Sequence, residues 1–420
     1  HMSHNPSSTA PGYLDLLRTP GALVFFTATL IGRIPLPMRP LGSILLIEQI
    51  TGSYGLAGII GATTTFVATV AWPRLGALTD RYGDRPVLLW SLLAHVIGIV
   101  ALVLTVYGDL HPLTWFASAI IIGASTMPFP SLSRARWAST LGSGPALEKA
   151  YALESIGDEI GFIVGPIIVV PLAVVVAPAA GLLAVIAFVG VASLVLALQP
   201  HDAEHDVRTE GPNLVAEASS GRSVIANRGI QVLVAALFCL GLIFGAVELM
   251  MVAFAEDQGS PGAASYLVAI FAFGSMLSAI VVGSRTWATP PSRRFVIWSI
   301  MLTIGTVPIL LANSIPFMAI AVFLTGIGIA PTMIAANSVV EGLAARHRLN
   351  EAFAWLSSAV ASGVAIGSIA SGVVIDEIGT RGGQAVGVVA GGLAATVVVI
   401  GANTLQGRRK TRPRSDRKTA

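Results

Sequence analysis

The chain has 420 residues, of which 54% are hydrophobic and 11% are charged, and its mean hydropathy is +0.79. A water-soluble domain carries about 25% charged residues, so this composition excludes a soluble globular protein and indicates an integral membrane protein. The net charge is only +3, and a single cysteine, Cys239, excludes a disulfide framework or a cysteine metal cluster.

Apolar segments long enough to cross a bilayer as helices recur along the whole chain. We expect an all-α integral membrane protein with about twelve transmembrane helices. The predicted spans are Gly21–Glu48, Tyr54–Leu75, Val87–Tyr107, Leu113–Leu132, a fifth beginning at Ala150, Ala179–Leu198, Gly229–Ala255, Ala263–Gly283, Phe295–Asn313, Phe317–Val339, Asn350–Val374 and Gln384–Leu405.

The first predicted span is interrupted near its middle by Arg33-Ile-Pro35-Leu-Pro37-Met-Arg39-Pro40. Proline removes a backbone donor and bends or breaks a helix. Irregular backbone at membrane depth is tolerated only inside protein or along a cavity. We therefore expect Arg33 and Arg39 to face inward, as candidates for substrate binding.

The stretch Gly76–Pro86 brings Asp80, Arg81, Asp84 and Arg85 together between the second and third spans. Charges at this density need water or lipid headgroups. We expect this stretch to be a loop between two membrane helices.

The third span contains a histidine, and the fourth contains two prolines. His95 is expected to be packed or hydrogen-bonded rather than a proton carrier. Pro128 and Pro130 are expected to break the fourth helix, and Ser133–Lys149 to form an inner loop.

Four carboxylates lie within predicted spans: Glu154, Asp158 and Glu159 in the fifth, and Glu248 in the seventh. Glu154 and Asp158 share a helical face, and Glu159 points roughly 100° away. Burial can raise the pKa of such acids until they carry protons. All four are therefore candidates for proton coupling.

Each acid also has a structural interpretation, which the sequence leaves open. The alternatives are pairing of Glu159 with Arg136 or Arg81, of Asp158 with Arg33 and of Glu248 with Arg39, and contact of Glu154 with headgroup water. Glu248 and Asn337 are further candidates for contact with a polar or cationic substrate group.

The basic residues predict the orientation of the chain. All Lys and Arg except Arg33, Arg39 and Arg381 lie at alternate ends of the spans. By the positive-inside rule these ends are cytoplasmic, so we expect both termini inside the cell and the protein in the inner (plasma) membrane. The basic tail is expected to bind anionic lipid, not nucleic acid.

The chain divides into two similar parts. Offsets of 202 pair Gly161 with Gly363, and an offset of 207 pairs Gly76 with Gly283. We predict two pseudo-symmetric six-helix bundles. The predicted divisions are a cytoplasmic segment at 1–19, bundles at 20–199 and 228–405, a cytoplasmic linker at 200–227 and a basic tail at 406–420.

No sequence pattern for a chemical reaction is present. The chain has no phosphate-binding glycine loop, no zinc-protease helix and no nucleophile elbow. We therefore expect neither an enzyme nor a protein with a cofactor or metal. If the protein transports a substrate, the energy must come from an existing ion or substrate gradient, because the chain has no pattern for ATP hydrolysis.

The pattern Gly76-x-Leu-x-Asp80-Arg81-x-Gly83-x-Arg85 resembles the signature between helices 2 and 3 of the major facilitator superfamily. The resemblance implies the two-bundle fold of that family. It also implies that Asp80 contacts the start of helix 11 and charges on helix 4 or 5, as a conformational latch with basic neighbours that include Arg136. Asp84 departs from the pattern, and the counterpart in the second half lacks the acid.

Gly161-x-x-x-Gly165-Pro166 in the fifth span partly resembles a signature of the drug:proton antiporters of this superfamily. The resemblance implies a monomeric, proton-coupled exporter of small amphipathic or drug-like compounds, working by alternating access. One alternative is a transporter of a defined metabolite, a sugar or an organic anion. Another is a non-transporting membrane receptor or scaffold.

Overall fold

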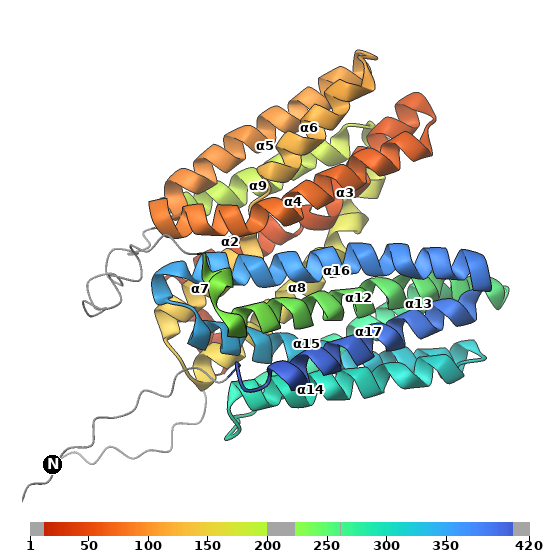
Figure 1. Cartoon of the computed structure of the whole chain (residues 1–420). Helices are drawn as coiled ribbons and strands as arrows, with labels where there is room; N and C mark the ends of the chain where they lie inside the picture. Colours follow the sequence, from red (N-terminus) through yellow and green to blue (C-terminus); the bar gives the residue numbers. More distant parts are fainter. Residues whose placement is uncertain (1–11, 200–222, 261, 406–420) are drawn as a thin grey trace, which may run out of the picture.

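The computed structural model describes residues 12–199, 223–260 and 262–405. Every secondary-structure element in these ranges is a helix, and short turns join the helices (Figure 1). Twelve helical segments of the described chain are long and apolar enough to cross a membrane. The expected all-α membrane fold is therefore confirmed. The predicted tail at 406–420 and most of the predicted linker at 200–227 lie outside the described residues.

The first half contains six of these spans, two of them divided into two helices each. Its helices are α1 (Tyr13–Leu17), α2 (Ala22–Arg33), α3 (Pro35–Thr51), α4 (Tyr54–Tyr82), α5 (Asp84–Tyr107), α6 (Pro112–Ala124), α7 (Phe129–Leu141), α8 (Pro145–Pro171) with a π-helical end (Leu172–Val176), and α9 (Ala180–Leu198).

The second half contains the other six spans. Its helices are α12 (Arg228–Asp257), α13 (Ala263–Gly283), α14 (Pro291–Thr306), α15 (Ile315–Leu343), α16 (Leu349–Ile378) and α17 (Thr380–Gly401), with short 3-10 turns at Val224–Ala226, Val307–Leu311 and Arg346–Arg348.

The predicted breaks in the first and fourth spans are present. Helix 1 is divided at Ile34, between α2 and α3, and Pro35 occupies the first turn of α3, where its missing N–H is not needed. Helix 4 is divided between Ala124 and Phe129, so that α6 and α7 are separate helices.

The predictions of a loop at Gly76–Pro86 and of another at Ser133–Lys149 are wrong, because both stretches are mostly helical. Within Gly76–Pro86 the turn is a single residue, Gly83, whose φ of +84° is readily adopted by glycine. Within Ser133–Lys149 the turn is Gly142–Gly144. The helices continue past their apolar spans because a helix satisfies its own backbone groups, and the charged side chains lie on the helix ends.

The glycines of α8 form a surface that receives the break in helix 1. A Cβ at Gly161 would lie 3.1 Å from Arg33 Cβ, and one at Gly165 would lie 2.6 Å from Pro37 Cγ and 2.8 Å from the Ile34 carbonyl oxygen. Small residues at four-residue spacing let helices approach closely. In this chain they seat the irregular backbone of helix 1 against α8.

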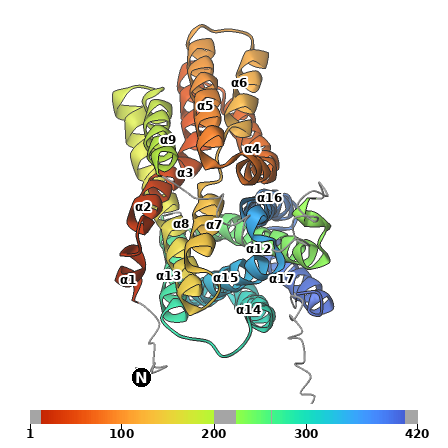
Figure 2. The same ribbon diagram turned by 90° about the vertical axis from the view of Figure 1, so that its left-hand side faces the viewer.

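The two bundles lie closest at one end and diverge toward the other (Figure 1). Between them, α4 packs on α16, and α8 packs on α13 and α15. In the turned view, α7 and α8 extend from the first bundle toward the second (Figure 2). We call the end where the bundles meet, which contains Asp80 and the start of α16, the joined end.

Candidate functional site

Asp80, near the end of α4, caps the start of α16 in the other bundle. Its carboxylate accepts hydrogen bonds from the Asn350 backbone N–H (3.1 Å), the Asn350 Nδ2 (2.9 Å) and the Glu351 backbone N–H (2.8 Å). The first N–H groups of a helix have no partner within the helix and carry partial positive charge. The carboxylate therefore bonds across the two halves to the start of helix 11, as the resemblance implied; the implied contact with charges on helix 4 or 5 stays a prediction.

Two glycines allow the bundles to touch at the joined end. A Cβ at Gly76 would lie 2.6 Å from the Asn350 carbonyl oxygen, and one at Gly283 would lie 2.4 Å from Ala152 Cβ. Real Cβ atoms do not approach other atoms this closely. The pair that the internal repeat aligned thus lies at two equivalent contacts between the halves.

Further contacts join the halves at the same end. Ser131 Oγ lies 3.1 Å from Ser357 Oγ, Ser143 donates to Glu341 at 2.8 Å, and Arg294 donates to Glu148 at 2.8 Å. Together with the hydrogen bonds of Asp80, these contacts hold the halves together at the joined end. The structure is therefore the state in which the joined end is closed.

Tyr13 of α1 adds a contact from the N-terminal segment. Its hydroxyl donates to the Ile280 carbonyl oxygen of α13 at 3.4 Å, and Lys149 Nζ lies 5.4 Å from its ring centroid. Burial raises the pKa of Tyr13, so its hydroxyl stays protonated and can donate. No pattern in the sequence identified this residue.

The basic residues around Asp80 differ in their contacts. Arg136 pairs with Asp84 at 2.7 Å and donates to Gln199 at 3.0 Å, so the predicted pairing of Glu159 with Arg136 is wrong. The Arg81 guanidinium lies 5.1 Å from the Tyr82 ring centroid. Asp84, the departure from the family pattern, therefore holds Arg136.

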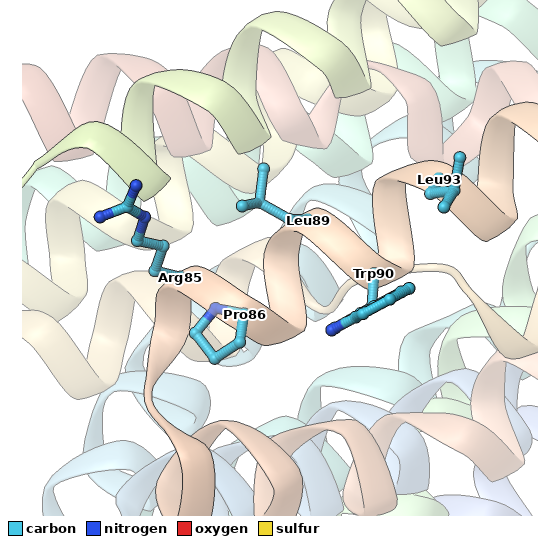
Figure 3. A pocket seen from close by; sticks show the side chains of 5 residues that line it. All are labelled: Arg85, Pro86, Leu89, Trp90 and Leu93. Carbon is cyan, nitrogen blue, oxygen red and sulfur yellow. The ribbon is translucent and has the colours of Figure 1, made fainter.

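Arg85 lies on the surface of α5. It is exposed and borders a surface groove on α5 together with Pro86, Leu89, Trp90 and Leu93 (Figure 3). Its predicted place beside the latch stays a prediction.

A buried charge cluster lies where α2, α7 and α8 meet. Arg33 is ion-paired with Glu154 and, through Nε, with Asp158 at 3.1 Å, and Arg134 is also paired with Asp158. Ser133 Oγ and Trp137 Nε1 donate to Glu154 at 2.7 and 2.8 Å. Each arginine is thus matched by an acid, as charges within a membrane require.

Exposure distinguishes the two acids of this cluster. The Glu154 side chain is fully buried and that of Asp158 is 31% exposed. The expectation that Glu154 reaches headgroup water is wrong, and the alternative that Asp158 neutralises Arg33 is confirmed. Arg134 was not identified because sequence alone placed it in a loop.

The remaining predicted site residues are dispersed. Glu248 is exposed on α12, and Glu159 is half-buried on α8, where it faces Ser275 of α13. Asn337 is 1% exposed. Arg39 contacts His95, so the predicted pair of Arg39 with Glu248 is wrong.

No group of three or more potential metal ligands occurs in the part of the chain that the structure describes.

The family model of the Major Facilitator Superfamily matches residues 21–288 and 233–420. The chain belongs to the major facilitator superfamily. It is a multi-pass membrane transporter for small molecules, not an enzyme, and the hypothesis of a non-transporting receptor or scaffold is not retained.

Solved structures of other superfamily members share the fold of this transporter. The human organic anion transporter MFSD10 (TETRAN) has a TM-score of 0.68 at 18% identity, over 92% of this chain and 98% of that chain. A bacterial homologue of the iron transporter ferroportin, in an outward-facing state, has a TM-score of 0.68 at 14% identity, over 90% of this chain and 98% of that chain.

The fucose:proton symporter FucP of E. coli has a TM-score of 0.66 at 15% identity, over 91% of this chain and 98% of that chain. A search of curated proteins finds no match. At these identities the similarity concerns the fold, and the cargo must be argued from the chain itself.

Proposed function

We propose that this transporter exports small amphipathic compounds in exchange for protons, by alternating access. Alternating access needs two bundles that rock about a central site. In support, the contacts between the halves gather at the joined end, and Asp80 there bonds to the free N–H groups of α16. Such polar contacts can break and reform as the bundles rock.

The distribution of basic residues supports the orientation. The joined end carries Arg81, Arg85, Arg136 and Arg294, and by the positive-inside rule it faces the cytoplasm. The state described here is then outward-facing. Both termini would lie in the cytoplasm, and the protein would reside in the inner (plasma) membrane.

The proposal of proton coupling rests on the position of Asp158. It is shared by Arg33 and Arg134, and it is the partly exposed member of an otherwise buried charge cluster. A proton on Asp158 would remove the charge that holds both arginines. Arg33 ends α2 next to the break in helix 1, so its release would act on a helix that is already divided.

Glu248 supports a cargo with a polar or cationic group. It is exposed in a membrane-spanning helix, and no ion pair of Glu248 occurs among the described residues. An unpaired intramembrane acid is a candidate site for an ion or a substrate. Its neighbours Met250 and Met251 are buried.

The test uses purified protein in proteoliposomes with an imposed pH gradient. Asp158→Asn should abolish the stimulation of flux by the gradient, and Glu248→Gln should weaken binding of a cationic cargo. Asp109→Asn, at an exposed turn at the other end, is the matched control. Unchanged gradient-driven flux in both variants would contradict the proposal.

Transport of an organic anion is the second candidate, and one observation favours it. Arg39 is a buried cation without an acidic partner among the described residues. A thermal-shift screen of cationic amphiphiles, sugars and organic anions at two pH values would separate the candidates, because a ligand that binds the folded state raises the melting temperature.

A further inference from the structure

Arg39 and His95 form a buried contact that the proposed coupling does not use. Arg39 Nε donates to His95 Nε2 at 3.1 Å, and His95 Nδ1 lies 3.1 Å from Ser125 Oγ. Arg39 is 3% exposed and His95 is 1% exposed. The contact links α3, the second part of helix 1, to α5 and to the turn after α6.

The contact determines the protonation of the imidazole. A guanidinium Nε donates and cannot accept, so His95 Nε2 must offer its lone pair. The single proton of His95 is then on Nδ1 and donates to Ser125 Oγ. The Ser125 hydroxyl in turn donates to the Ile121 carbonyl oxygen at 2.7 Å. His95 is therefore neutral in this state.

The charges around His95 are few. Arg39 is the charged group that faces it from α3. α6 and α9 contain no ionisable residue, those of α5 itself lie at its ends, and those of α4 lie at its first residue or from Arg74 onward. Within the described residues, no acid compensates Arg39.

We propose that His95 is a proton-binding group of the transport cycle, and that helix 1 is held by two proton-sensitive contacts, one on each side of its break. This inference rests on the proposed proton coupling and adds a second site to it. The proton would bind Nε2, the atom that now accepts from Arg39. Proton binding and the Arg39 contact therefore exclude each other.

Both contacts respond to acid in the same direction. A proton on Asp158 removes an attraction for Arg33, which ends α2. A proton on His95 places two cations at hydrogen-bond distance in a poorly solvated interior, which repels Arg39 in α3. The break at Ile34 lies between the two contacts, with Arg33 at the end of α2 and Arg39 in α3. Protonation would thus release helix 1 from both anchors.

Nitrogen NMR of the histidine rings tests the exclusion without a substrate. Protein labelled at its histidine nitrogens is compared with His95→Gln to assign the signal. We expect the proton on Nδ1 at about pH 8, and conversion to imidazolium on acidification. In Arg39→Gln the conversion should occur at higher pH. A proton on Nε2, a ring that stays neutral, or equal midpoints in both proteins would overturn the proposal.

Transport tests the role in coupling. Glutamine at position 95 can still accept from Arg39 and donate to Ser125, but it cannot bind a proton. His95→Gln should therefore lose the stimulation of flux by a pH gradient and keep downhill flux. His111→Gln, at an exposed turn, is the control for loss of an imidazole and should keep the stimulation.

The two proposals fail in different ways. If flux through the wild-type protein ignores the pH gradient, the proposed function fails, and the ring titration still decides whether proton and Arg39 compete. If the gradient drives the wild-type protein and His95→Gln equally, the role of His95 in coupling is overturned and the role of Asp158 stands.

Discussion

Asp80 acts through the donors at one helix end. It accepts hydrogen bonds from two backbone N–H groups and one side-chain amide of Asn350 and Glu351, in the first turn of α16, which belongs to the other bundle. Hydrogen bonds to a charged acceptor are each worth about 1.5–3 kcal/mol. One carboxylate can therefore bias the equilibrium between two rocking states.

Asp80→Asn should weaken the closed state of the joined end. The amide keeps one acceptor and loses the charge, so we expect a shift of about 1.5–3 kcal/mol, or roughly 10- to 150-fold in the conformational equilibrium. Spin labels across this end report the shift, and transport should slow while substrate affinity stays within a few-fold. Asp257→Asn, at the other end of the molecule, is the control. A wild-type rate with an unchanged distance would remove the latch role.

Gly76→Ala tests the close approach of the backbones. The added methyl would meet the Asn350 carbonyl oxygen, so the joined end should open or the bundles should shift. Gly58→Ala is a matched control on the same helix, because a Cβ there has nothing within 4 Å. Alanine in a helix otherwise stabilises by about 0.5–1 kcal/mol. Equal distances across the joined end in both variants would contradict this role for Gly76.

At the scale of elements, helix 1 and α8 form one unit. The glycines of α8 receive the irregular backbone of helix 1, and the acids of α8 hold its arginine. The partial antiporter signature Gly161–Pro166 therefore has a structural basis in this chain that is independent of the cargo. It places the break in helix 1 and a charge cluster side by side.

Gly165→Ala should lower the thermal stability. Its methyl would overlap Pro37 and the Ile34 carbonyl oxygen, and overpacking of this kind costs about 1–3 kcal/mol. Gly190→Ala in α9 has open space and should leave the melting temperature unchanged or higher. Melting curves in detergent compare the two, and equal melting temperatures would show that the packing at Gly165 adapts.

At the scale of the whole molecule, the closed end can be locked covalently. Ser131 of α7 and Ser357 of α16 have their hydroxyl oxygens 3.1 Å apart across the halves. Cysteines at both positions, in a Cys239→Ala background, should form a disulfide on oxidation. Transport should then fall to background and recover on reduction. Each single-cysteine variant is the control, and full transport by cross-linked protein would show that this end need not open.

The sequence by itself determined the class and the plan of the molecule. Apolar spans with charges at their ends follow directly from the cost of placing charges and free backbone groups in lipid. The alternation of basic ends indicates the orientation, and the internal repeat indicates the two-bundle plan. The proline breaks of helices 1 and 4 could be predicted for the same reason, since proline acts locally. The motif around Asp80 also led to the correct partner helix.

Tertiary structure alone decided which charges meet. Arg136 pairs with Asp84 and not with Glu159, Arg39 meets His95 and not Glu248, and Arg134 joins the cluster from a helix that looked like a loop. Side-chain pairing depends on the rotation and crossing of helices, which a hydropathy pattern does not specify. Helical ends beyond the membrane are equally hard to predict, because their charged residues resemble those of a loop.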